Sequence, residues 1–480
     1  MSAGLTIPFT NADWAALVPI GIVAVTALVV LLVDLAARTY APRYLSIAIG
    51  AAGAVAAGVV AAPQFGHDYS AFFGGFVTGG FTVVFEEVVL IALIGSLILY
   101  GSIGKAERMA GTTALMLWST CGAMLMAGSA NLMTIFLGLE LLSLGLYCLC
   151  GLDERKTARE SALKYLILSS TASGFLLYGM GLLFGASGSV MLAALTNPAL
   201  ANNPLFWTGA GMFLIGIAFK LALVPFHMWA PDVYEGAPLP VTAYMSVATK
   251  AATLAVFARF MYAALPAGSS DRLLLPVWIV AGLSMIFGNV GMLAQRDLKR
   301  LLAYSGTAQV GYILTALAGG TSQGLRYAIY YLTAYTFMNL GAFAVAAAMS
   351  GPGEEGSRIA NYQRLGRRRP LLAAAMTFFM LAMAGLPPTA GFLGKILILS
   401  ASVGAGYVWL GALLIVGTAI SLYAYAKVVR AMYEREDRHA THDLQPFVPL
   451  AWASVVLCFV VVIAMTFYPL TPSNVLPLVK

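Results

Sequence analysis

Residues 14–33 read WAALVPIGIVAVTALVVLLV, a run without a charged side chain. A helix needs about 20 apolar residues to cross the hydrocarbon core of a bilayer, and this run and residues 82–102 both have about that length. The chain of 480 residues is 60% hydrophobic and only 10% charged, which is more apolar surface than one water-soluble core can bury. The sequence therefore predicts an all-α polytopic membrane protein.

Charged or Gly/Pro-rich breaks divide the apolar runs into about fourteen spans. Two spans are interrupted internally, the seventh at Val224-Pro225 and the twelfth at Leu386-Pro387-Pro388, because proline removes a helical hydrogen bond. These broken helices 7 and 12 stand five spans apart, so equivalent segments cross in opposite directions, as two inverted five-helix repeats require. We therefore expect an N-terminal three-helix segment (1–105), a first repeat of spans four to eight (106–265), a second of spans nine to thirteen (266–433) and a C-terminal span (434–480).

Basic residues recur in alternate breaks, which are residues 38–43, 153–160, 296–300, 354–369 and 434–443. Only Arg272, Arg326 and Lys480 fall clearly on the opposite side. Loops rich in Lys and Arg stay in the cytoplasm, so both termini are expected outside it. We interpret the formal charge of +7 as this topology signal, and no motif indicates a nucleic-acid partner. Because no basic residue precedes it, the first run is expected to be a retained helix rather than a signal peptide.

The four cysteines are expected to be packing residues of the spans. They are too few and too scattered for a disulfide framework, and the spacing of Cys148 and Cys150 fits neither zinc nor iron–sulfur sites. The chain also lacks a Gly-rich nucleotide fingerprint and a cluster of metal ligands. The sequence therefore predicts no cofactor or metal in this chain.

Four charged residues fall well inside predicted spans: Glu140 in the fifth, Lys220 before the break of the seventh, Lys250 in the eighth and Lys395 beyond the prolines of the twelfth. A charge at membrane depth costs at least ~2.5 kcal/mol, so such residues usually face a wet cavity or a partner. Any one of them alone is explained equally well by a side chain that reaches the interface. Four central charges together indicate an ion pathway.

The carboxylate and the lysines have complementary chemistry. A lysine in apolar surroundings gives up its proton more easily than one in water, and a nearby carboxylate makes it hold the proton. We therefore expect Lys220 to act as a switch that keeps its proton while Glu140 is close and otherwise passes it toward Lys250 and then Lys395. Carbonyls and amides freed at the broken helices can hold water between these side chains.

Other polar residues are weaker candidates for the ion pathway. His227 lies two helical turns after Lys220 and is a candidate relay, although a structural histidine is an alternative. Lys164 and Lys427 lie near span ends, where a side chain that reaches the interface is at least as good an explanation; Lys164 ranks higher because it can approach the region of Glu140. The tyrosines of the eleventh span are equally well explained by packing.

Several motifs together are similar to one known family. They are GLELLSL (138–144), ALKY (162–165), FKLALVPFHMWAPDVYEGAP (219–238), AQRDLKRLLAYS (294–305) and GLPPTAGFLGK (385–395). They cover nearly the whole chain and resemble the antiporter-like subunits of NADH-quinone oxidoreductase, respiratory complex I. The pattern is most similar to subunit N for two reasons. Lys395 stands where the subunit M type has glutamate, and the long C-terminal extension of subunit L is absent.

The resemblance implies a proton-translocating subunit of the bacterial inner membrane, in which Glu140 and Lys220 are the coupling pair, Lys250 the central relay and Lys395 the outward-side terminal residue. It places NADH, FMN, iron–sulfur clusters and quinone in other subunits, and sister antiporter-like subunits and lipid around this chain. Gly145 and Gly306 replace a proline and a serine common in relatives, but neither change removes an ionisable group. The resemblance therefore assigns the oxidoreductase activity to the whole complex, of which this chain is one subunit.

Two other functions fit the same features. A subunit of a monovalent cation/proton antiporter, or of a related membrane-bound hydrogenase complex, shares the fold and much of the seventh-span motif. A scaffold that only spaces other subunits is a further alternative, but the four buried charges argue against it.

Overall fold

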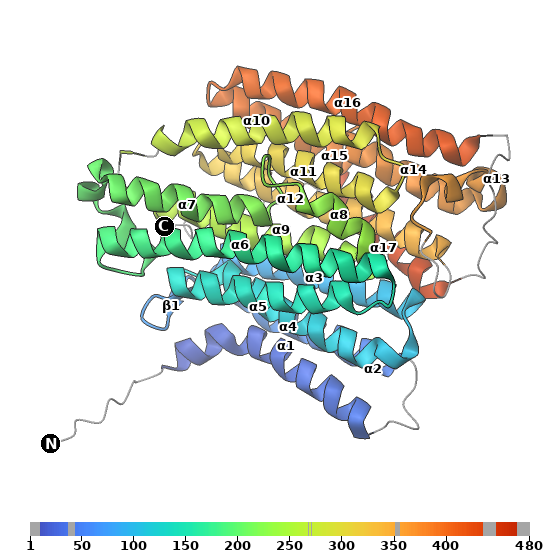
Figure 1. Ribbon diagram of the computed structural model, residues 1–480, viewed down its shortest axis with the longest axis horizontal. Coiled ribbons are helices and arrows are strands. Elements are labelled where there is room, and N and C mark those ends of the chain that lie inside the picture. The colour runs from blue at the N-terminus through green and yellow to red at the C-terminus, as the bar shows by residue number, and fades with distance from the viewer. Residues whose placement is uncertain are drawn as a thin grey trace.

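The computed structural model of the protein is a bundle of helices that lie side by side with roughly parallel axes (Figure 1). The structure describes residues 10–36, 44–266, 268–269, 271–350, 356–434 and 448–467. Their α-helices are α1 (Asn11–Ala36), α2 (Leu45–Ala61), α3 (Gly80–Ile103), α4 (Met109–Gly128), α5 (Leu132–Gly151), α6 (Lys156–Ser187), α7 (Pro204–Lys220), α8 (Trp229–Gly236), α9 (Leu239–Ala263), α10 (Asp271–Leu293), α11 (Leu298–Leu317), α12 (Ser322–Met349), α13 (Leu365–Arg368), α14 (Pro370–Ala384), α15 (Ala390–Gly404), α16 (Val408–Tyr433) and α17 (Pro449–Phe467). The strands are β1 (Tyr69–Ala71) and β2 (Phe76–Thr78).

Within these ranges, eleven helices are long and apolar enough to cross a membrane. The remaining spans are α11, which is 20 residues long but more polar, and the two broken pairs α7/α8 and α14/α15. When these three are added to the eleven, the described part of the chain holds fourteen spans. The expected helical membrane fold and number of spans are therefore confirmed.

The centre of the bundle is formed by α9 and α12. Every residue of α9 from Leu239 to Phe260 is buried, and most of α12 is buried too. The outer helices instead expose apolar side chains, such as Leu32 on α1 at 64% and Val59 on α2 at 68%. A surface of this kind is covered by lipid rather than water, so the charged residues of the interior lie in the most protected part of the fold.

The seventh span breaks where the sequence predicts. α7 ends at Lys220, residues 221–228 leave the helix, and α8 starts at Trp229. Pro225 lies inside this interruption, where its missing N–H removes no helical hydrogen bond. The buried Trp229 indole donates to the Phe219 carbonyl over 2.8 Å, so a side chain satisfies one of the acceptors freed at the end of α7.

The twelfth span breaks at its predicted prolines as well. α14 ends at Ala384, and Gly385 takes a left-handed φ of 84°, which is costly for a residue with a Cβ. α15 begins after Thr389, whose hydroxyl caps the helix. The carbonyls of Met383 and Ala384 are left without a partner in their own helix.

A small hairpin that the sequence did not predict joins α2 to α3. β1 and β2 pair antiparallel with Tyr69 opposite Thr78, at one end of the bundle (Figure 1). Phe72, Phe73 and Gly74 form the turn with positive φ angles, and the Phe72 amide donates to the Asp13 carboxylate at the start of α1. The hairpin therefore ties α1 to the entry of α3.

Some of the residues used to predict orientation lie outside the described residues. They are residues 38–43, 354–355 and 435–443 and Lys480. The inverted relation of the two repeats, the four-part division of the chain and the side on which its termini lie remain predictions. The five-span separation of the two breaks agrees with such repeats.

Candidate functional site

Lys220 is the last residue of α7 and lies inside the bundle with 2% of its surface exposed. Its ammonium donates to the Ser143 hydroxyl over 2.7 Å and to the Tyr165 hydroxyl over 3.3 Å. It also lies 5.0 Å from the centre of the Tyr165 ring and 5.7 Å from that of Tyr147. The break after Lys220 therefore places a cation among hydroxyls and aromatic rings.

Glu140 is half-buried on α5, one helical turn before Ser143. It accepts a hydrogen bond from the Ser173 hydroxyl of α6 over 2.5 Å. Among the described residues it makes no ion pair with Lys220. Ser143 shares the Glu140 face of α5 and binds the Lys220 ammonium, so it connects the expected coupling pair.

Lys250 lies on α9 and is 2% exposed. Its Nζ is 3.5 Å from the Tyr234 hydroxyl, 5.5 Å from the Tyr234 ring centre and 5.7 Å from that of Tyr335. Gly306 of α11 faces the same ammonium, and a Cβ there would lie 2.1 Å from Nζ. Because Gly306 has no side chain, the Lys250 ammonium can occupy the space that a Cβ would fill.

Lys395 lies on α15 and is 4% exposed. Its ammonium donates to the carbonyls of Met383 and Ala384 over 3.2 and 2.9 Å, the two acceptors freed at the end of α14. It also lies 4.7 Å from the Tyr312 ring centre. The twelfth-span break therefore serves as a carbonyl site for this lysine, as expected for a broken membrane helix.

The two secondary candidates lie apart from these lysines. The half-buried His227 packs edge-on to Tyr304, with ring centres 6.2 Å apart, and its buried Nδ1 has no partner among the described residues. Lys164 pairs with Glu160 at 2.7 Å and Asp232 at 3.3 Å, and 44% of its side chain is exposed. The expected approach of Lys164 to Glu140 is thus replaced by pairing within a surface charge cluster.

Sequence reasoning missed several buried polar residues. Arg259 of α9 is 4% exposed and donates to the Thr82 hydroxyl over 3.1 Å and the Ala127 carbonyl over 3.0 Å. Glu86 of α3 is 2% exposed. Gln309 of α11 lies in a hydrogen-bond network near Lys395. Glu86 and Arg259 were recognisable as charges within apolar runs, whereas nothing in the sequence marks Gln309.

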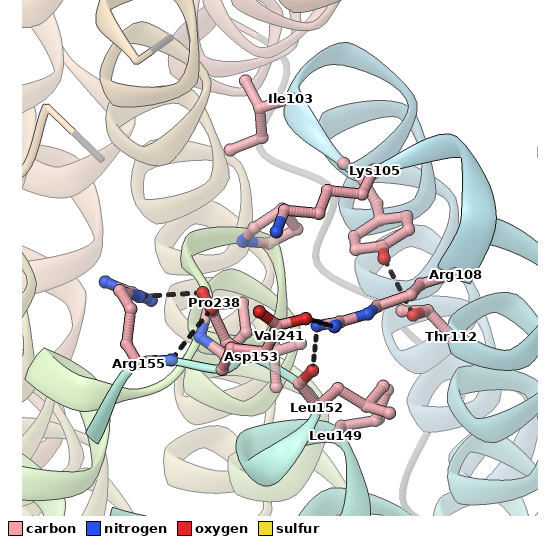
Figure 2. Close-up of a pocket in the computed structure, with 14 residues that line it drawn as sticks. Ile103, Lys105, Arg108, Thr112, Leu149, Leu152, Asp153, Arg155, Pro238 and Val241 are labelled. Carbon is pink, nitrogen blue, oxygen red and sulfur yellow. Dashed lines mark hydrogen bonds and ion pairs between the residues drawn. The ribbon is translucent and has the colours of Figure 1, made fainter. Parts of the chain in front are cut away.

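A cavity of about 300 Å³ lies where the ends of α3 and α5 meet the start of α9 (Figure 2). In Figure 2 the Arg108 side chain points to the Leu152 carbonyl, and Arg155 points to Asp153. Arg108 also pairs with Glu154, and the Arg155–Asp153 distance is 2.8 Å. None of the predicted site residues lines it. The cavity is therefore separate from the lysine series, and its charges largely neutralise one another.

In the described ranges no group of three or more His, Cys, Asp or Glu side chains is arranged to bind a metal ion. The four cysteines are free; three are buried and Cys148 is exposed.

Residues 129–421 match the family model described as NADH:quinone oxidoreductase/Mrp antiporter, TM. The NADH-quinone oxidoreductase subunit N of Trichlorobacter lovleyi is 39% identical over 93% of this chain and 93% of its own length. The chain belongs to the subunit N family of NADH-quinone oxidoreductases. The family predicted from the motifs is therefore confirmed.

Solved structures agree with this family. A chain of respiratory complex I from Thermus thermophilus with bound Aureothin is 32% identical, with a TM-score of 0.81 over 96% of this chain and 99% of that one. A chain of the Mrp complex from Dietzia sp. DQ12-45-1b also has a TM-score of 0.81, over 95% of each chain, but only 22% identity. The second likeness shows the shared fold alone.

Proposed function

We propose that this chain translocates protons across the bacterial inner membrane as a membrane-arm subunit of NADH-quinone oxidoreductase, and that Lys220, Lys250 and Lys395 carry the protons. The main support for this proposal is the chemistry of the groups around the three ammoniums. Their partners are hydroxyls, backbone carbonyls and aromatic rings. An ammonium with only neutral partners can release its proton without leaving an unpaired carboxylate in the apolar interior.

Glu140 acts as the charge that controls the first lysine. Its carboxylate lies one helical turn from Ser143, the hydroxyl that binds Lys220. When Glu140 is ionised and near, Lys220 keeps its proton; when Glu140 is neutralised or moves away, the proton passes toward Lys250. Lys395 is the outward-side terminal residue, and His227 and Lys164 assist at the edges.

Redox chemistry takes place elsewhere in the proposed enzyme. NADH, FMN, iron–sulfur clusters and quinone are bound by other subunits, and sister antiporter-like subunits lie next to this one in the membrane. Support comes from the relatives named NADH-quinone oxidoreductase subunit N. The bias of Lys and Arg toward alternate loops supports both termini on the periplasmic side.

Lys220→Ala in native membrane vesicles tests the function. At equal assembly of the enzyme, we expect NADH-driven quinone reduction and proton uptake to fall together, because translocation is coupled to turnover. Lys427→Ala is the matched control: Lys427 donates to the Leu293 and Gln295 carbonyls over 3.3 and 3.0 Å and belongs to no relay. The control should keep wild-type rates.

A monovalent cation/proton antiporter subunit is the second candidate, favoured only by the shared fold. If Lys220→Ala left quinone reduction and its proton uptake intact but abolished sodium-driven proton exchange, the antiporter function would replace ours. Full activity in every assay would instead support the scaffold.

A further inference from the structure

Lys250 and Lys395 lie on helices α9 and α15, and α11 packs against both. If protons pass between these lysines, as proposed above, something polar has to connect them through α11. Two of its residues, Ser305 and Gln309, stand four positions apart and therefore on one face. Both are at least 99% buried.

The connection begins at the Met383 carbonyl beside Lys395. This oxygen accepts from the Lys395 ammonium over 3.2 Å and from the Gln309 side-chain amide over 3.3 Å. One carbonyl freed by the twelfth-span break thus binds both the lysine and the glutamine.

Two hydroxyls bind Gln309 on its other side, and a third binds one of them. Its Nε2 donates to the Tyr425 hydroxyl of α16 over 3.4 Å, and its Oε1 accepts from the Tyr331 hydroxyl of α12. The Tyr425 and Ser305 hydroxyls are 2.5 Å apart, and either can donate. Helices α11, α12, α14 and α16 thus meet in one hydrogen-bonded cluster.

The cluster reaches Lys250 at Gly306, the residue after Ser305. A Cβ built at Gly306 would lie 2.1 Å from the Lys250 Nζ and 3.2 Å from the Tyr335 hydroxyl. The buried Tyr335 hydroxyl has no partner among the described residues. A buried hydroxyl without a partner beside an ammonium commonly marks the position of a water.

We propose that Ser305 and Tyr425 form the proton path between Lys250 and Lys395, with Gln309 as its positioning residue. The Lys250 ammonium gives up a proton to water beside the Tyr335 hydroxyl, each hydroxyl of the path releases its own proton as it accepts one, and water hands the last proton to neutral Lys395. Gln309 is not protonated, since its amide only holds Tyr425 next to the Met383 carbonyl.

The test uses Tyr425→Phe and Gln309→Leu in the assembled enzyme in membrane vesicles. Loss of one hydrogen bond or hydroxyl in the path is expected to lower NADH-driven proton uptake about fivefold. If the transfer becomes rate-limiting, the solvent deuterium isotope effect on quinone reduction must rise, a change that a purely structural role would not cause.

The matched control is Tyr330→Phe, which removes a buried hydroxyl of α12 that donates outside the cluster, to the Met465 carbonyl over 2.9 Å. It should keep the wild-type rate and isotope effect. Wild-type values for Tyr425→Phe and Gln309→Leu, while Lys395→Ala is inactive, would overturn the path and leave the proposed function standing. Full proton uptake in Lys395→Ala would overturn the proposed function itself.

Discussion

Gly306 shows how a single missing side chain can position a charge. The space that a Cβ would fill is taken by the Lys250 ammonium, 2.1 Å from that point. Because the end of a lysine is flexible, Gly306→Ala should push the ammonium aside rather than disrupt α11, and alanine also favours a helix. We expect normal assembly with NADH-driven proton uptake about fivefold lower, through loss of the Lys250 hydrogen bond.

A glycine in an open position serves as the control for this prediction. Gly181 on α6 has no atom within 4 Å of the position its Cβ would take, so Gly181→Ala should behave as wild type. Equal proton uptake by both variants would show that the position of the Lys250 ammonium does not limit transfer.

At the scale of single residues, charged members of the site can be recognised from the sequence more readily than neutral ones. Lys220, Lys250 and Lys395 were found because a charge within an apolar run is costly and therefore conspicuous. Gln309 and Tyr425 are ordinary residues of polar or aromatic helices until the packing of α11 against α16 brings them together. Contacts between distant helices depend on their rotation, which composition does not determine.

At the scale of elements, the half-helix α8 depends on its neighbours for position. It is separated from α7 by residues 221–228 and packs on α6 and α11. Asp232 of α8 pairs with Arg300 of α11 at 2.6 Å and with Lys164 of α6 at 3.3 Å. These ion pairs connect α8 to the two helices on which it packs, α6 and α11.

Asp232→Asn should loosen α8 without unfolding the chain. The paired side chains are 30–44% exposed, so the loss is limited to a fraction of the usual surface ion-pair energy. We expect quinone reduction about twofold lower at equal assembly, with the difference from wild type shrinking in high salt because salt screens exposed pairs. Glu434→Gln, which removes the exposed Arg430–Glu434 pair at 3.4 Å, is the control and should show no change. A salt-independent defect would contradict an ionic role.

The breaks themselves were predictable from local chemistry. Proline removes a helical donor wherever it stands inside a helix, so Pro225, Pro387 and Pro388 located both interruptions. The partners of the freed groups were not predictable. The Trp229 indole binds one freed carbonyl and Lys395 binds two others, and these choices follow from tertiary packing.

At the scale of the whole molecule, the polar groups lie at the centre and the apolar ones outside. α9 and α12 are the most buried of the eleven long apolar spans, and α11 is buried along almost its whole length, while α1 and α16 lie at opposite edges of the bundle in Figure 1. Lys250 comes from α9, and Tyr331 and Tyr335 come from α12. The side chains of the proposed path are likewise buried, including Tyr425 of α16 at 0% exposed and Lys395 of α15 at 4%, which keeps the protons away from the bilayer.

The nature of these central groups predicts which ion is carried. Sodium, like other hard cations, is bound by oxygen ligands, preferably carboxylates and carbonyls. In the proposed path the groups that bind and release the proton are ammoniums, which repel a cation. The Met383 and Ala384 carbonyls, which could bind a cation, accept hydrogen bonds from Lys395 instead. NADH-driven proton uptake in vesicles should therefore be the same in sodium-free potassium buffer as in sodium buffer. Uptake that required sodium, or sodium accumulation that persisted with a protonophore present, would show that oxygen ligands rather than the lysines carry the ion.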